Sequence, residues 1–316
     1  LSEDEHRELT ESLAQNQDIA RFMDAYMKNL ILTKDGYERE TYVMVLGQPK
    51  DSENYVHFHD RKTKEAYELS DDGAIISEKT AKLLNAKVGD TISIKDEKDG
   101  NKDIVIQNIC ENYMGHYLYL TPKYYEKVYG EKPEYNTVLF SVQDNYTREQ
   151  MEEAGEKVLA RDEVLSLSYM KDIEKRLNDM LKSLNLVIIV LIVSAGMLAF
   201  VVLYNLNTIN IAERKRELAT LRVLGFYNPE VAAYVYRENI LLTLIGTIVG
   251  AGLGKILHLF IIETVEVPAA MFGRTINLPS YIYSFIFTIL FSMIVNGVMY
   301  FKLRKIDMVE SLKSIE

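Results

Sequence analysis

The 316-residue sequence contains one cysteine, Cys110, and fewer basic than acidic residues, with a formal net charge of −10. A single cysteine excludes an intrachain disulfide framework. The acidic balance argues against a nucleic-acid-binding protein, which needs a basic surface. The chain begins at Leu1 without a basic segment followed by an apolar one, so it shows no signal peptide. We expect it to be a piece of a longer polypeptide.

The sequence also lacks a recognisable set of catalytic or metal-binding residues. His57 and His59 alternate in "YVHFHD", but two ligands without a third are a weak indication of a metal, and we interpret them as a solvated strand face. "VGAGLGKI" has the spacing of a phosphate-binding loop, but Val249 stands where glycine is required and Ile256 where serine or threonine is required. The sequence therefore predicts no enzyme activity, no cofactor and no metal.

Charged residues are almost absent from three long stretches in the second half of the chain. Residues 184–206 and 280–301 carry no charge, and residues 239–262 are interrupted only by Lys255 and His258 near their end. About 20 apolar residues in a helix span the hydrocarbon core of a bilayer. The alternative, three core helices of a large soluble protein, is disfavoured because the stretches are so long and so free of charge. We predict three transmembrane helices.

The charge changes sign along the chain and divides it into two predicted domains. Residues 1–180 have a net charge of −13 and residues 181–316 a net charge of +3. Bases gather in the loop after the first span and in the tail at 302–316, whereas the loop between the second and third spans sets Arg274 against Glu263 and Glu266. The positive-inside rule then places that first loop and the C-terminus in the cytoplasm and residues 1–180 outside the cell.

Residues 1–180 show both strand and helix periodicity, which predicts an α+β extracytoplasmic domain with hairpin-type connections ahead of an all-α membrane domain. Apolar residues recurring at helical spacing over 173–184 predict a stalk helix that runs from this domain into the first span. The predicted strands cover 41–46, 75–76, 92–94, 103–110 and 137–142, and the predicted helices 81–84, 122–129 and 147–159.

Three glycines in the second span repeat every four residues: Gly246, Gly250 and Gly254. This spacing places them on one face of a helix, where small residues let another helix approach closely. We predict that this face packs against a second helix.

The segment between the first two spans, "ERKRELATLRVLGF" over 213–226, is densely charged. Leu218 and Leu221 share one flank of a helical projection whereas Val223 and Leu224 do not, which is unlike a helix lying on lipid. Gly225 can end this helix in a left-handed conformation and Pro229 suits the first turn of the next. The pattern indicates a short helix held by protein on more than one side.

The stretch from Asn207 to Phe226, the early Glu238 of the next span, and the ending "KLRKIDMVESLKSIE" resemble the C-terminal module of FtsX-like permeases. These are membrane subunits of ABC systems that include the macrolide-exporter and lipoprotein-release types. The resemblance implies that the helix at about 211–225 is a coupling helix that docks on a separate ABC ATPase at the cytoplasmic side. The matching coupling positions are Glu213, Arg214, Arg216, Glu217, Leu221, Arg222 and Gly225.

The same resemblance implies a non-catalytic permease subunit in a bacterial plasma membrane, in contact with lipid. A second permease module is expected, as a homodimer, as a heterodimer or as an upstream part of the same chain. Its function would be export or extraction of a lipophilic or peptide substrate. Two alternatives stay open: non-transport signalling, such as peptide-antibiotic sensing or control of a cell-wall hydrolase, and a membrane-anchored receptor or adhesion module without an ATPase.

Overall fold

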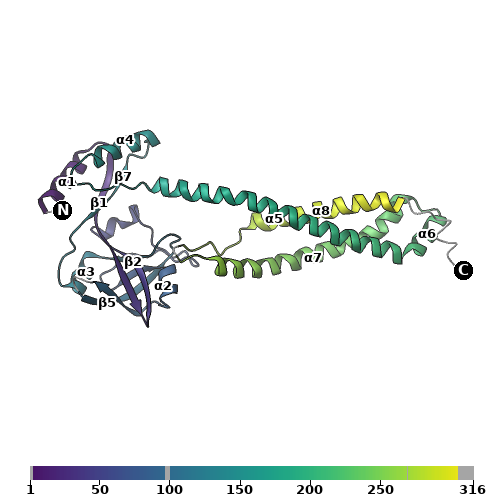
Figure 1. Cartoon of the computed structure of the whole chain (residues 1–316), viewed down its shortest axis with the longest axis horizontal. Helices are drawn as coiled ribbons and strands as arrows, with labels where there is room; N and C mark the ends of the chain where they lie inside the picture. The colour runs from purple at the N-terminus through teal and green to yellow at the C-terminus, as the bar shows by residue number, and fades with distance from the viewer. Residues whose placement is uncertain (1–2, 97–99, 269, 305–316) are drawn as a thin grey trace. The chain divides into compact units, whose positions relative to one another are not determined.

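The computed structural model describes residues 3–96, 100–268 and 270–304 (Figure 1). The chain divides into two compact units. The sheet unit consists of residues 1–168 together with 266–273, and the helical unit consists of residues 169–265 together with 274–316. The predicted boundary at residue 180 therefore falls inside a continuous helix, and a short segment late in the sequence, residues 266–273, joins the sheet unit.

The sheet unit contains seven strands, four α-helices and one short 3₁₀ helix among its described residues. The strands are β1 (Ile19–Lys34), β2 (Tyr37–Leu46), β3 (Ala74–Ser77), β4 (Thr91–Asp96), β5 (Gly100–Cys110), β6 (Tyr117–Leu120) and β7 (Thr137–Val142). The helices are α1 (Glu3–Gln15), α2 (Glu78–Leu83), α3 (Pro122–Tyr129) and α4 (Arg148–Leu159), with the 3₁₀ helix η1 at Pro49–Asn54.

Six of the strands close into a ring. The sheet order is β2-β6-β3-β5-β4-β1-β7, and β1 also pairs with β2, which joins the first and sixth strands of that order. Strand β1 can do this because it is 16 residues long: its start pairs with β7, its middle and end with β2, and its last residues with β4. Each of these six strands therefore has a neighbouring strand on both sides over part of its length.

The main core fills the interior of this ring. Alternate residues of each strand point inward and are buried: Leu30, Leu32, Val43, Val45, Ala74, Ile76, Ile92, Ile94, Ile104, Ile106, Leu118 and Leu120. A second buried cluster lies on the outer surface of the ring and includes Met23, Met44, Phe58, Ile75 and Cys110. Strands β1, β2, β3, β5 and β6 contribute to both clusters and so bury both faces over part of their length, which explains why their apolar residues often occur in runs rather than in strict alternation.

The structure confirms the α+β class and most of the predicted elements. Helix α3 and strand β7 have the predicted bounds, and Thr147 caps α4 with Gln150 in a reciprocal capping box. The hairpin-type connections hold for β1–β2 and β4–β5, but β2–β6 and β3–β5 are parallel pairs. The prediction of a strand at His57 and His59 is wrong, because this segment makes only one isolated bridge, from His59 to Ala66.

The helical unit is built from α5 (Met170–Glu213), α6 (Lys215–Val223), α7 (Asn228–Val265) and α8 (Leu278–Arg304). Three of its helices are long and apolar enough to cross a membrane, at Asn185–Glu213, Pro229–Val265 and Leu278–Phe301. The predicted count of three spans is therefore confirmed, as is the continuous helix that leads from the stalk into the first span. The tail predicted at 302–316 lies outside the described residues beyond Arg304.

The glycines of the helical unit occupy two different environments. A Cβ at Gly196 of α5 would overlap the ring of Phe291 of α8, so these helices approach closely at this point. Around Gly246, Gly250 and Gly254, by contrast, a Cβ would meet no described atom within 4 Å. The close helix approach predicted for the three α7 glycines thus has no partner among the described residues and stays a prediction about another segment or chain.

Cys110 should be unreactive in the folded protein. Its residue is 2 % exposed, and burial raises the pKa of its thiol to about 12, so the nucleophilic thiolate is not formed near neutral pH. We expect a thiol reagent such as DTNB to label less than a tenth of the native chain at pH 8, and one thiol per chain after unfolding in guanidinium. Rapid labelling of the native protein would contradict the burial of this residue.

Replacing Gly196 should loosen the packing of α5 on α8. Gly196→Leu forces a side chain into the space of the Phe291 ring, and overpacking of this kind costs about 1–3 kcal/mol. We expect a lower melting temperature of the detergent-purified protein. Gly252→Leu is the matched control, since Gly252 also lies in a membrane helix but has open space around it. Equal melting temperatures for the two variants would contradict the close approach.

Candidate functional site

The segment between α5 and α7 is a short helix with a defined end. Helix α5 ends at Glu213, Arg214 leaves helical geometry with φ −96° and ψ 13°, and α6 begins at Lys215. At its other end, Gly225 has φ +97°, and the Phe226 N–H donates to the Leu221 carbonyl at 3.2 Å. This is a Schellman-type helix end, which satisfies a carbonyl group that the helix itself leaves without a partner. The predicted left-handed conformation of Gly225 is confirmed.

One face of α6 is fixed to the helical unit. Leu218 and Ala219 are each 4 % exposed, and Leu221 packs partly buried against the same cluster. The cluster is completed by side chains of α5, α7 and α8, among them Ile211, Val231, Ala232, Val295 and Met299. Because residues of four helices meet here, α6 cannot shift without disturbing the packing of the whole unit.

Two polar contacts tie the same region together. The Arg214 guanidinium contacts the Glu238 carboxylate at 2.8 Å, and both side chains are partly exposed. Asn239 of α7 donates a hydrogen bond to the side-chain oxygen of Asn207 of α5, and both residues are buried. Partly exposed ion pairs contribute about 0–1 kcal/mol. The buried amide pair is the more specific contact, because either amide alone would be left without a partner.

The opposite face of α6 is exposed and carries charge. Glu213, Lys215, Arg216 and Glu217 are all exposed, and none of them has an ion-pair partner among the described residues. Beyond them, four apolar or aromatic residues surround Gly225 with large exposed fractions. These four, which we call the tip, are Val223 (67 %), Leu224 (70 %), Phe226 (49 %) and Tyr227 (76 %).

The predicted coupling residues thus separate into three groups. Glu213, Arg216 and Glu217 are exposed, Arg214 and Leu221 are engaged within the unit, and Gly225 sets the backbone of the helix end. The side chain of Arg222 lies outside the described residues. Sequence analysis missed Phe226 and Tyr227 as members of the exposed group. The sequence did contain a signal for an exposed group at this end of the helix, because the neighbouring Val223 and Leu224 do not lie on the flank that Leu218 and Leu221 share.

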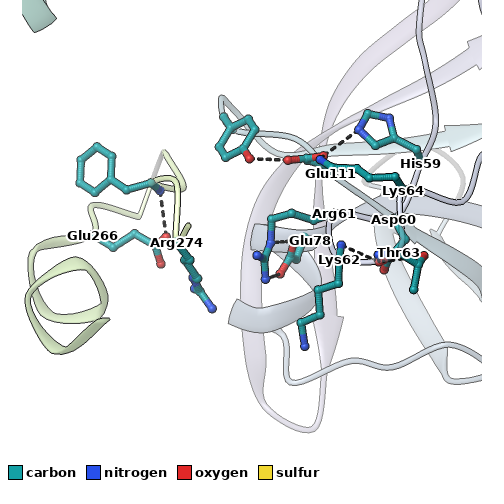
Figure 2. A network of polar contacts seen from close by, with 12 residues as sticks. His59, Asp60, Arg61, Lys62, Thr63, Lys64, Glu78, Glu111, Glu266 and Arg274 are labelled. Atoms are coloured by element: carbon teal, nitrogen blue, oxygen red, sulfur yellow. Dashed lines mark hydrogen bonds and ion pairs between the residues drawn. The ribbon is translucent and has the colours of Figure 1, made fainter. Parts of the chain in front are cut away.

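The sheet unit contains a second concentration of polar residues (Figure 2). The Glu111 carboxylate, with a side chain only 7 % exposed, accepts hydrogen bonds from Lys64 Nζ at 2.7 Å and from the Tyr113 hydroxyl, and lies 2.7 Å from His59 Nε2. Burial opposes ionisation of Glu111, but these hydrogen bonds hold its pKa below the usual value. Arg61 makes two hydrogen bonds to Glu78 at 2.8 and 3.1 Å.

This polar network is a set of satisfied ion pairs rather than a reactive centre. His59, one of the two histidines considered from sequence, is committed to Glu111. Within the described ranges, no three His, Cys, Asp or Glu side chains come together in a way that could hold a metal ion. The exposed face of α6 is therefore the better candidate for a functional surface.

Comparison with known proteins identifies a family for the helical part of the chain. Residues 189–308, which include α6 and its supporting helices, match the family model described as FtsX-like permease C-terminal. The chain contains an FtsX-like permease C-terminal domain. An uncharacterised ABC transporter permease from Methanocaldococcus jannaschii is 27 % identical to the chain over 190 residues, which cover 59 % of this chain and 46 % of the relative. The chain thus spans about half the length of this relative.

Solved structures show a weaker likeness, over about half of the chain. The extracellular domain of the noncanonic ABC-type transporter YknZ from Gram-positive bacteria has 14 % identity and a TM-score of 0.32, covering 47 % of this chain and 76 % of that one. The periplasmic region of MacB from Actinobacillus actinomycetemcomitans has 10 % identity and a TM-score of 0.33, with 49 % and 72 % covered. Scores below 0.5 do not establish a common fold, so the description of the sheet unit rests on its own strand pairings.

The Asn207–Asn239 hydrogen bond should stabilise the FtsX-like domain. Asn207→Leu leaves the Asn239 amide buried without a partner, and interhelical hydrogen bonds in membranes contribute about 0.6–2 kcal/mol. We expect each single Leu variant to lower the denaturant midpoint in detergent, and the double variant Asn207→Leu/Asn239→Leu to lose less than the two singles added together. Asn205→Leu, at an exposed position of the same helix, is the control. Strict additivity would contradict a direct interaction.

Proposed function

We propose that this chain is a membrane-spanning permease subunit of an ABC transporter complex and that α6 with its tip docks on a separate cytoplasmic ATPase. The sheet unit is then extracytoplasmic and the C-terminus cytoplasmic, in agreement with the basic residues of the segment around α6. The permease hydrolyses nothing itself. It passes the movement of the ATPase to the sheet unit, for export or extraction of a lipophilic or peptide substrate.

The observation that carries this proposal is the exposed tip on a fixed base. Four apolar or aromatic side chains are held in water-accessible positions next to a row of exposed charges that have no ion-pair partner among the described residues, at the end of a helix whose other face is buried. Apolar residues gathered at one exposed point, with charges beside them, are typical of a protein-protein contact. A cytoplasmic ATPase, which the FtsX-like family implies, fits both the apolar and the charged part.

The proposal assigns different roles to the residues that the family resemblance groups together. Glu213, Arg216 and Glu217 would face the ATPase together with the tip. Arg214 and Leu221 would hold α6 in place, through Glu238 and through the buried cluster. Gly225 would fix the direction of the tip. Arg222 is retained as a contact position on the strength of the family pattern alone.

Force can pass along the chain because α5 is continuous. Its 44 residues correspond to a rod of about 66 Å at 1.5 Å per residue. A displacement at α6 therefore reaches the beginning of α5 without a hinge within that helix. Such coupling requires two states of the permease with different affinities for the ATP-bound partner.

A second permease module is part of the proposal. Three spans do not enclose a pathway by themselves, and no described atom packs within 4 Å of a Cβ placed at Gly246, Gly250 or Gly254. We infer that this face packs against a helix of the second module or of a preceding part of the polypeptide, and that the remaining apolar surface contacts lipid.

Variants of the tip should detach the ATPase without unfolding the permease. Leu224→Asp and Phe226→Asp place charges in the proposed apolar contact, and we expect at least a tenfold loss of ATP hydrolysis co-purifying with the full-length permease in mild detergent. Val88→Asp, an exposed apolar position of the sheet unit at 58 %, controls for the added charge. Melting temperatures near that of the parent would show that the fold is kept.

Undiminished co-purifying ATP hydrolysis in both tip variants would overturn the docking assignment. Absence of any ATPase with the parent protein would overturn the permease assignment and favour a receptor or adhesion role. If the ATPase is present, ATP-dependent movement of a labelled lipid or peptide across reconstituted vesicles separates transport from signalling.

A further inference from the structure

The connection between α7 and α8 folds as part of the sheet unit. We call residues 266–273 the clasp; all of them except residue 269 are described. The clasp belongs to the sheet unit, whereas Val265 before it and Arg274 after it belong to the helical unit. Ala270 forms an antiparallel bridge with Met114, and the Met271 N–H donates to the Tyr113 carbonyl at 2.9 Å. Met271 is 3 % exposed, so its side chain is buried.

A buried ion pair fixes the start of the clasp. Lys79 Nζ of α2 lies 2.7 Å from Glu266 Oε2, and the two side chains are only 6 % and 2 % exposed. The other oxygen, Glu266 Oε1, accepts the Phe272 N–H at 3.1 Å, a contact that Figure 2 shows within the clasp. One carboxylate therefore binds the sheet unit and also closes the clasp on itself. Releasing the clasp would break both of these contacts.

Further polar groups of the sheet unit approach the clasp. His116 Nδ1 lies within hydrogen-bond distance of the Thr80 hydroxyl, at 2.9 Å. His116 also forms a hydrogen bond with the Pro268 main chain. Thr80 is fully buried and lies 2.6 Å from the Ser77 hydroxyl. Tyr113, whose carbonyl holds Met271, is itself bonded to Glu111 of the polar network (Figure 2). The clasp thus contacts α2 and the β5–β6 connection, and that connection is in turn hydrogen-bonded to the polar network.

The number of places where the chain passes between the two units affects how freely the sheet unit can move. The polypeptide leaves or enters the sheet unit three times, after Ser168, after Val265 and after Gly273. The first crossing leads into α5, and the other two lead to α7 and α8. A single crossing would let the sheet unit swivel about one point, whereas a buried clasp attaches it to the chain ends of two further helices.

We propose that the clasp is a permanent second mechanical link, through which α7 and α8 move the sheet unit together with α5. The buried Lys79–Glu266 pair and Met271 keep it docked throughout the working cycle. The link itself follows from the contacts of the clasp, whereas its part in a working cycle rests on the proposed function. The alternative is a latch that opens during the cycle, and it would have to expose Met271 and separate the buried pair.

A disulfide tests whether the clasp is docked. Met114→Cys and Ala270→Cys introduce thiols at bridge partners, whose Cα atoms in antiparallel strands lie about 4.5–5.5 Å apart, within disulfide range. In a Cys110→Ser background, we expect mild oxidation of the full-length protein to cross-link more than half of the chains, measured by mass spectrometry of non-reduced peptides. Val88→Cys with Ala270→Cys is the control. Cross-linking no higher than in the control would overturn the proposal.

Charge exchange tests the buried pair. Lys79→Glu or Glu266→Lys alone places two like charges together, and we expect at least a fivefold drop in the rate of disulfide formation. The double exchange Lys79→Glu/Glu266→Lys should restore most of that rate, which guards against variants that merely misfold. The exposed pair Lys95–Glu38, with side chains 46 % and 53 % exposed, provides the control exchange and should change the rate less than twofold. Equal effects at the two pairs would overturn the role of Lys79 and Glu266.

The cross-linked protein then separates a permanent link from an opening latch. If the clasp stays docked, oxidised and reduced permease should show ATP-dependent activity within twofold of each other. A tenfold loss on oxidation, reversed by reductant, would overturn the permanent link and identify a latch. If no ATPase accompanies the protein at all, the proposed function fails, while the cross-linking and charge-exchange results still decide whether the clasp is docked.

Discussion

The hydrogen-bond ladders of one strand hold the sheet unit together. Strand β1 pairs with β2, β4 and β7 at successive positions, and the ring of six strands closes only because β1 reaches both β2 and β4. Ring closure surrounds the interior side chains with strands, so few helices are needed to cover the main core. Ring closure also fixes the position of α2, which directly follows β3, and of the β5–β6 connection. Both of these segments contact the clasp. The attachment of the chain ends of α7 and α8 therefore depends on the same closure.

The helical unit follows a different constraint. Its long helices satisfy their backbone groups internally, as any segment in hydrocarbon must, and most of their apolar surface remains open. A buried apolar cluster, the Asn207–Asn239 hydrogen bond and the Arg214–Glu238 ion pair lie together near α6, at one end of the unit. This arrangement gives a firm base to a small exposed surface. A charged motif that looks uniform in sequence thus contains residues that face inward and residues that face outward.

Several features could be predicted from sequence because their signals are local. Helix α3 begins with Thr-Pro and ends at a glycine. The membrane helices are recognised from stretches of more than 20 residues with almost no charge. Strand β1 was missed because its buried positions change from odd numbers, at Met23 and Ala25, to even numbers, at Leu30 and Leu32, so no single alternation spans it. The clasp was missed because Lys79 and Glu266 are 187 residues apart, and Glu266 seemed to be only a loop charge. Non-local ion pairs leave no periodic trace in a single sequence.

In the proposed docking of α6, Gly225 would matter to recognition without offering any group to a partner. Its left-handed backbone ends α6 between the exposed Leu224 and Phe226, and a residue with a Cβ adopts that geometry only with strain. The glycine would therefore supply preorganisation of the backbone: the entropy of ordering this turn is lost when the permease folds and not when a partner arrives. A loss of affinity on substituting Gly225 would measure that conformational contribution, and it would say nothing about a contact made by the glycine itself.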